Sequence, residues 1–500
     1  MTPAASEPEK YSIDEMIERL KGQAADSPPA AGELVTRADG SQALRVRKRK
    51  RRSEQPERDQ AKRSRHTRTR QMASGLVLLL LCGLVIGSAY VYANTPTYRK
   101  AIIAAIASNT GASVEFRQFR VNPASANVDA LTLEWPEGSP IRAFHLNGVS
   151  ADVSVFGLFA TRLRGNEVSA RDGSLWLQPL AGAAGPAAVP PAGAPPWQFN
   201  TISIPKFDIV LGESTLPALH ILATEASLRL DKTSSQTTLH LYHGNLQLAD
   251  WPLFKIDRAV MELRATETKL LVLRITDSQS KHGILDLTGN ILPFANRSPS
   301  TLSVKLDNFE LGELLGPEFG ELISAKLDTR PDASPNSLTF LPDSPADAEL
   351  NLAFKSTLSS KVSIRNFPFL LSLVRTLNDK WYENPSFVGD FTGRIHRTKT
   401  SVQLRELHLE SKSRMAIHAE FTSSTDKSLS GTMDIGIPES IAQLAHNSKV
   451  NSMLSQPRDG YRWLTLKLGG TLAHPSDDFA ALYAAAKEPD LDATDPAETP

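Results

Sequence analysis

Apolar and polar residues alternate with a period of two along most of the chain from residue 113 onward. The segment LTLEW is the first clear example, and MELRA at residues 261–265 is another. Such alternation is typical of a half-buried β-strand with one dry face and one wet face. Strands of a buried parallel sheet read as continuous apolar runs instead, so the pattern favours a long antiparallel sheet curled over its own apolar face. The side chains that we expect on that face include Leu131, Leu133, Trp135, Leu271, Leu273 and Ile275.

The period changes to that of a helix in a few short segments. Thr95 and Pro96 begin one such segment, which runs to about Asn109 and ends before Gly111. Proline in the first turn and glycine after the last turn are ordinary helix boundaries. Further short helices are predicted at roughly 311–322, 367–380, 439–455 and 476–487. For the apolar helix at 367–377, the sequence favours covering one end of a sheet core and leaves open lining a groove or touching a membrane.

One uncharged stretch of 21 residues, from Ala73 to Ala93, differs from everything else in the chain. At about 1.5 Å per residue a helix of this length measures roughly 32 Å, which matches a hydrocarbon core of about 30 Å. Tyr90 and Tyr92 lie at its far end, where aromatic rings favour the membrane interface. The stretch therefore predicts one transmembrane helix over 73–93.

The charge before this stretch predicts its direction. Residues 45–70 hold 13 Lys and Arg against three acidic residues, a net charge of +10. Excess Lys and Arg stay on the cytoplasmic side, so the N-terminus is expected in the cytoplasm and the bulk of the chain on the other side of the membrane. A cleaved signal peptide stays open as an alternative, although its n-region would be unusually long. The basic residues that we expect at the anionic membrane surface are Arg47, Lys48, Arg49, Lys50, Arg51 and Arg52.

The same basic run has the composition of a nucleic-acid or nuclear-targeting patch. Its position beside a membrane span makes topology the simpler explanation, so no nucleic-acid partner is expected. The rest of the segment 1–72 is predicted to be a disordered cytoplasmic tail because of its charge and its Pro, Ala and Gly content. Within it, Ser12 and Glu15 form a capping box ahead of a short amphipathic helix at 12–21, which either docks a cytoplasmic partner or has no role.

The external part divides at residues 181–196, which are Ala, Gly and Pro apart from Val189. Such a segment cannot fill a core and is predicted to be a linker or a long loop. It separates a helix and β module at 94–180 from a β-rich region at 197–487, and residues 488–500 are predicted to be a disordered tail. Overall the fold class is mainly β: a long twisted antiparallel sheet curled into an elongated groove, with a few short helices.

Composition narrows the chemistry. The single Cys excludes a disulfide framework and a Cys-rich metal site, and the chain lacks the Walker A, GxSxG, HExxH and GxGxxG motifs. His240 and His243 would face opposite sides of a strand, which makes a poor metal site. Asp477 and Asp478 follow Ser476 at a helix start, where carboxylates cap rather than catalyse. We therefore expect no enzyme, no cofactor and no metal site.

Three segments resemble the AsmA-like family of envelope proteins, which includes the TamB-type bridge proteins. The first is NTPTYRKAIIAAIASNTGASVEFRQF after the span, and the second is a series of strands that contain glycine near their ends, such as ILDLTGNI and FVGDFTGRI. The third is YRWLTLKLGGTLAHPSDDF near the end of the chain. The long basic segment before the span departs from the family pattern. The resemblance implies an inner-membrane anchor, a twisted elongated sheet with an apolar groove, and a role in moving or organising lipids between membranes.

Two functions are therefore expected to compete. In the first, a single-pass envelope protein binds, shields or transfers membrane lipid along an apolar β-groove and contributes to envelope or outer-membrane biogenesis. In the second, it is a non-enzymatic periplasmic scaffold that links a cytoplasmic partner to other envelope proteins. An uncovered apolar face favours lipid, whereas the same face packed on a second layer, as in an ordinary sandwich, favours a scaffold. An envelope hydrolase with dispersed catalytic residues is the third and weakest alternative.

Overall fold

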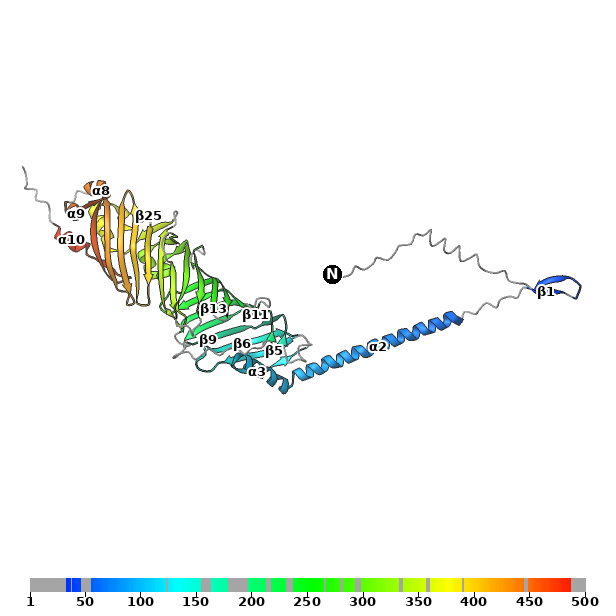
Figure 1. Ribbon diagram of the computed structural model, residues 1–500. Coiled ribbons are helices and arrows are strands. Elements are labelled where there is room, and N and C mark those ends of the chain that lie inside the picture. Colours follow the sequence, from blue (N-terminus) through cyan, green and yellow to red (C-terminus); the bar gives the residue numbers. More distant parts are fainter. Residues whose placement is uncertain are drawn as a thin grey trace, which may run out of the picture. The chain divides into compact units, whose positions relative to one another are not determined.

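The computed structural model describes residues 33–36, 38–45, 55–122, 125–153, 163–178, 197–212, 217–230, 237–264, 267–278, 282–292, 298–331, 336–356, 360–388, 391–444 and 448–486. These residues divide into two compact units, Met1–Gly83 and Leu84–Pro500. The fold is mainly β, with helices at both ends of the second unit (Figure 1).

The first unit contains more regular structure than the sequence predicts. Strands β1 (Glu33–Thr36) and β2 (Gln42–Arg45) form an antiparallel hairpin, and helix α2 begins at Gln55 and continues to Ala93. The sequence predicts a mostly disordered tail with one short helix over residues 1–72, and the structure places this hairpin and the first half of α2 within that segment. The predicted helix at 12–21 and the basic residues from Arg47 to Arg52 lie outside the described residues, as do segments 181–196 and 488–500.

Helix α2 includes one segment, Ser74–Ala93, that is long and apolar enough to cross a membrane. Helix α3 (Pro96–Thr110) follows after a short turn, as the sequence predicts. The Thr95 hydroxyl accepts a hydrogen bond from the Tyr98 amide at 3.3 Å, and Gly111 ends the helix in the left-handed conformation with φ of 69°. Tyr98 and Ile106 are buried and anchor α3 to the first strands of the sheet.

One large sheet of 25 strands dominates the second unit. Its first half contains β3 (Ser113–Arg117), β4 (Arg120–Val121), β5 (Ser125–Glu134), β6 (Ile141–Asp152), β8 (Glu167–Ser169), β9 (Asp172–Leu177), β11 (Thr201–Ile204), β12 (Phe207–Gly212), β13 (Pro217–Leu230), β14 (Thr237–Leu248), β15 (Phe254–Leu263), β16 (Thr268–Thr276), β17 (Ile284–Ile291) and β18 (Ser300–Asp307). Its second half contains β19 (Phe309–Glu310), β21 (Lys326–Thr329), β22 (Ser337–Leu341), β23 (Ser344–Ser356), β26 (Phe391–Arg397), β27 (Ser401–Ser411), β28 (Met415–Ser424), β29 (Leu429–Pro438), β30 (Gln456–Arg458), β31 (Tyr461–Gly470) and β32 (Pro475–Asp477).

The sheet is mixed, not purely antiparallel as the alternation predicts. Strand β11 pairs in parallel with β8, and β12 pairs in parallel with β9, on either side of the Ala/Gly/Pro segment. A separate short pair, β7 (Leu163–Arg164) and β10 (Trp197–Gln198), is also parallel. Parallel neighbours need a long connection rather than a tight hairpin, and the connection at 179–196 is long enough to provide one. The two regions on either side of this connection therefore share one continuous sheet.

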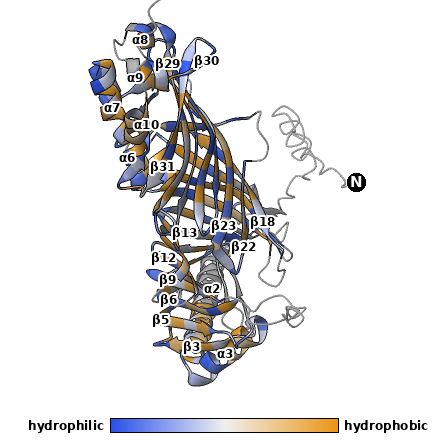
Figure 2. Cartoon of the chain, turned by 90° about the vertical axis from the view of Figure 1, so that its left-hand side faces the viewer, coloured by the Kyte–Doolittle hydropathy of each residue, from blue (hydrophilic) through white to orange (hydrophobic). Residues whose placement is uncertain are grey.

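Apolar rows run across this sheet, because consecutive strands place one inward residue opposite the next. One row crosses seven strands and consists of Ile204, Ala226, Leu241, Ala259, Leu273, Leu287 and Val304. Directly opposed apolar side chains stabilise neighbouring strands by roughly 0.2–1 kcal/mol per pair. The rows give the sheet one apolar face, and Figure 2 shows the orange apolar residues interspersed with blue polar ones along the strands.

The C-terminal strands carry a second layer on that face. It consists of α5 (Leu311–Leu315), α6 (Pro317–Leu322), α7 (Pro368–Leu377), η1 (Lys380–Glu383), α8 (Glu439–Leu444), α9 (Ser448–Met453), α10 (Phe479–Ala485) and the small sheet of β20 (Ile323–Ser324), β24 (Lys361–Ile364) and β25 (Ser386–Val388). Figure 2 shows α6, α7 and α10 along the strands at this end. Phe369, Leu370 and Leu373 of α7 are buried in one cluster with inward residues of β26–β31. This end of the sheet therefore has a filled core, and α7 covers it as the sequence favours.

A candidate apolar binding cavity

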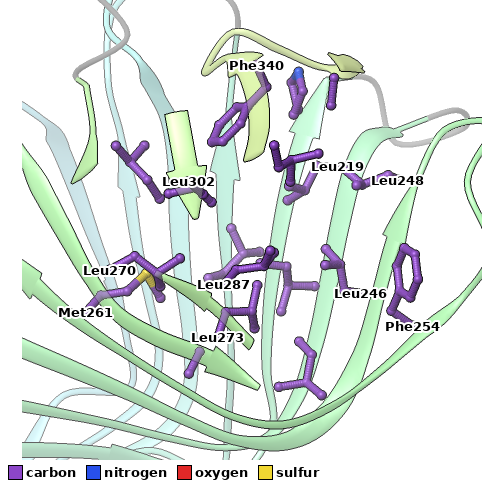
Figure 3. A pocket seen from close by; sticks show the side chains of 18 of the residues that line it. Leu219, Leu246, Leu248, Phe254, Met261, Leu270, Leu273, Leu287, Leu302 and Phe340 are labelled. Atoms are coloured by element: carbon purple, nitrogen blue, oxygen red, sulfur yellow. The ribbon is translucent and has the colours of Figure 1, made fainter. Parts of the chain in front are cut away.

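The sheet lines a half-open cavity of about 500 Å³ between its N-terminal strands and the filled core. Figure 3 shows side chains from several neighbouring strands converging on it. Of the described residues that line it, all are apolar except Thr268. A volume of this size falls within the range of about 300–1,000 Å³ that is usual for small-molecule sites.

The strand register explains why the lining is continuous. Met261 lies opposite Leu270, and Leu246 lies opposite both Ile221 and Phe254, so inward side chains follow one another from strand to strand. The lining begins at β6 and β9 with Ile141, Leu175 and Leu177 and ends at β23 with Ala348 and Leu350.

A β-bulge in β16 corrects one predicted site residue. Between Leu270 and Leu273, strand β16 contains one more residue than its partner β17, and an irregularity at the same place interrupts its pairing with β15. An extra residue reverses the facing of every residue before it. Leu270 consequently points inward, while Leu271 lies on the outer face with 38% of its surface exposed. The alternation that groups Leu271 with Leu273 and Ile275 is therefore wrong at Leu271; the other two line the cavity.

The predicted residues of β5, Leu131 and Leu133, and Trp135 just after this strand lie on the same face of the sheet but farther toward its N-terminal edge. Leu133 is opposite Phe144, which is opposite Leu175 at the start of the cavity lining. Leu131 and Trp135 are half-buried and pack with the helix α3 cluster, and the Trp135 indole donates a hydrogen bond to the Thr110 carbonyl at 2.9 Å. None of these three lines the cavity. Their contact with lipid stays a prediction.

The other end of the cavity meets a buried arginine that the sequence analysis overlooked. Arg397 occupies an inward position of β26, opposite the lining residue Leu350, and only 6% of its surface is exposed. Its guanidinium carbon lies 4.1 Å from the ring centre of Trp251, another lining residue. Burial lowers the Arg397 pKa to about 10, and the nearby negative charge of Asp250 opposes this shift. The sequence FTGRIHR could have revealed this buried arginine, because alternation places Arg397 at the next inward position after Ile395.

Other polar clusters lie away from the cavity. On the outer face, His408 and His418 are cross-strand partners with ring centres 4.7 Å apart, and the His418 ring also stacks on Trp463. Burial is the main cause of a lowered His418 pKa. His240 stacks on Tyr242 on another part of the sheet. Among the residues that the structure describes, no group of three or more His, Cys, Asp or Glu side chains is arranged to hold a metal ion.

Comparisons with models of protein families, with curated proteins and with solved structures find no match to this chain.

Proposed function

We propose that this protein is a single-pass membrane protein that binds the acyl part of a membrane lipid in the cavity of its β-sheet. The observation that carries the proposal is the lining: inward residues from many strands form one surface on which Thr268 is the only polar residue among those that the structure describes. A site without fixed polar groups selects a ligand by its apolar surface, and an acyl chain offers such a surface.

Binding of this kind has a sufficient driving force. Transfer of an acyl chain from water into an apolar site contributes about 0.8 kcal/mol for each buried methylene. An apolar cavity also gains contacts when it is filled, because its lining otherwise lacks neighbouring atoms on one side. A lipid chain that leaves a bilayer would meet a comparable environment here.

The proposed topology follows from the span and its charge. Helix α2 contains the candidate span at Ser74–Ala93, and the basic run before it supports a cytoplasmic N-terminus and a periplasmic sheet. The resemblance to AsmA-like proteins supports the same arrangement and a contribution to envelope biogenesis. The basic run would also hold the anchor against anionic head groups.

A matched pair of variants tests lipid binding. Leu273→Glu places a charge in the lining, whereas Leu271→Glu places the same charge on the outer face two residues away. Because an unpaired buried charge is strongly unfavourable, we expect Leu273→Glu to weaken binding of a fluorescent acyl chain at least ~10-fold, which corresponds to about 1.4 kcal/mol. Leu271→Glu should bind as the natural protein does.

Mass spectrometry of the purified protein supplies the second readout. Co-purified lipid that decreases in Leu273→Glu, with unchanged circular dichroism, supports the proposal. Protein that purifies without lipid and whose affinity for the acyl chain is unchanged by both substitutions would refute lipid binding and favour the periplasmic scaffold. The filled core under α7 is the observation that favours that second function, since this part of the sheet offers no open apolar face.

A further inference from the structure

We infer that the cavity selects an amphiphile with an anionic head group, and that the Arg397 guanidinium receives this group at the end of the cavity. The inference rests on the proposed acyl-chain binding and adds the chemical class of the ligand and its orientation. Three observations at Arg397 carry it: burial, incomplete hydrogen bonding and an incompletely compensated charge.

The hydrogen bonding of Arg397 is incomplete. One terminal nitrogen donates to the Asp250 carbonyl, and the other donates to the Leu315 carbonyl at 3.5 Å. The Nε atom is buried and has no hydrogen-bond partner within the described residues. A guanidinium carries five N–H donors in a planar fork that matches a carboxylate or phosphate. The donors that the two carbonyl groups leave free can bind such a group.

The charge of Arg397 also lacks a close counter-ion. In the described part of the chain, no carboxylate forms an ion pair with it. The negative charge that acts on it is that of Asp250, an exposed residue of the turn between β14 and β15. Asp347, another acid of this region, pairs with Lys399 at 2.7 Å. A buried cation without a paired carboxylate is unusual, because buried charges are normally paired.

The position of Arg397 fits the polar end of an amphiphile site. Leu350, opposite it in the sheet, lines the cavity, and so do Trp251 under its guanidinium and Leu314 beside its acceptor Leu315. Folding has already removed most water from the guanidinium, so an incoming anion meets a donor that is desolvated and held in place. Such preorganisation increases the net gain from a charge-assisted hydrogen bond.

Three ligands with the same sixteen-carbon chain test the inference: hexadecanoic acid, hexadecyl phosphate and hexadecanol. We expect the natural full-length protein to bind at least one of the two anions ~10-fold or more tightly than the alcohol, and the two anions distinguish a carboxylate from a phosphate site. Inorganic phosphate alone should not displace them, because the chain supplies the binding energy. Equal affinity for all three ligands would overturn the inference but not the proposed function. Failure to bind any of the three ligands would overturn both the inference and the proposed function.

Matched variants then assign the preference to Arg397. Arg397→Met should abolish the preference for anions while leaving hexadecanol affinity unchanged. Arg394→Met, in the same strand but on the exposed face where Arg394 pairs with Glu406, should keep it. Equal losses for acid and alcohol in Arg397→Met would assign Arg397 a purely structural role. If this variant does not fold, quenching of Trp251 fluorescence in the natural protein tests the orientation of the ligand, and Trp251→Phe identifies which part of the fluorescence comes from Trp251. Quenching by 2-bromohexadecanoic acid should exceed quenching by the 16-bromo isomer, because the head group lies beside Trp251. The reverse order would overturn the inference.

Discussion

At the scale of single residues, buried tyrosines couple the stability of this sheet to hydrogen bonding and pH. Tyr382 is fully buried below the C-terminal strands, and its hydroxyl donates to the Arg414 carbonyl at 2.9 Å. Burial is the main cause that raises its pKa to about 12, with the charge of Asp379 adding to the shift. Burial likewise raises the pKa of Tyr98 to about 12.

These tyrosines predict an alkaline limit of stability. A phenol with a pKa of about 12 in the folded chain and roughly 10 in the unfolded chain stabilises the fold below pH ~10. That stability decreases as the pH rises from ~10 to ~12, because the unfolded chain then loses its protons first. We expect the denaturation midpoint in urea to decrease over this range. A midpoint that stays constant from pH 9 to pH 12 would contradict the assignment.

Tyr382→Phe tests the same residue at neutral pH. The variant loses one buried hydrogen bond and leaves the Arg414 carbonyl without this donor, so unfolding at pH 7 should require about 1 kcal/mol less free energy. The decrease above pH ~10 should also become smaller than in the natural protein. Urea titrations at both pH values measure the two effects together.

At the scale of elements, residues far apart in the sequence cap each other's helices. Helix α7 has no side-chain cap from its own N-cap residue Phe367. Instead, the Asp477 carboxylate accepts hydrogen bonds from the amides of Phe369 at 2.7 Å and Phe479 at 3.1 Å. One side chain thus caps both α7 and α10. The sequence predicts capping by Asp477 but cannot show that the second helix lies 108 residues away.

Asp477 variants separate hydrogen bonding from charge. Burial raises the Asp477 pKa, and the two amide hydrogen bonds oppose the shift only in part. A raised folded-state pKa means that stability decreases as the pH rises through it, so the charge is unfavourable at pH 7. Asp477→Ala should therefore lower the free energy of unfolding by about 0.5–2 kcal/mol through loss of the cap. Asp477→Asn keeps an acceptor without the charge and should be at least as stable as the natural protein at pH 7; equal destabilisation by both changes would be inconsistent with this account.

At the scale of the whole molecule, one candidate span and one large sheet organise the chain. Cys82, the single Cys, lies within the apolar segment Ser74–Ala93, which makes the chain suitable for labelling experiments. In a bilayer this thiol should be shielded from a membrane-impermeant maleimide and should react after denaturation.

Two introduced cysteines test the proposed topology in a Cys82→Ser background. Ser41→Cys and Ala473→Cys both replace exposed residues, one before and one after the span. In spheroplasts, we expect the impermeant maleimide to label Ala473→Cys directly and Ser41→Cys only after permeabilisation. Labelling of both before permeabilisation, or the opposite order, would exclude the proposed orientation.

The sequence by itself determined the local features of this protein. The apolar stretch before Asn94 and the period-two alternation follow from backbone hydrogen bonding and side-chain geometry, so the apolar second half of helix α2, the helix α3 and the mainly β fold were predictable. The family, the lipid and the topology stay predictions. Most of the predicted inward residues also face the apolar side, because facing depends on position within one strand.

Only the tertiary structure decided how the strands combine. The extra residue at Leu271 changes the facing within β16, and alternation within a short segment cannot reveal it because a bulge is defined by the partner strand. The parallel pairs depend on a return of the chain over a long connection. The cavity and Arg397 likewise arise from contacts between residues as far as 147 positions apart. Local pattern fixes which face is apolar, whereas long-range packing decides whether that face is covered, empty or closed by a buried charge.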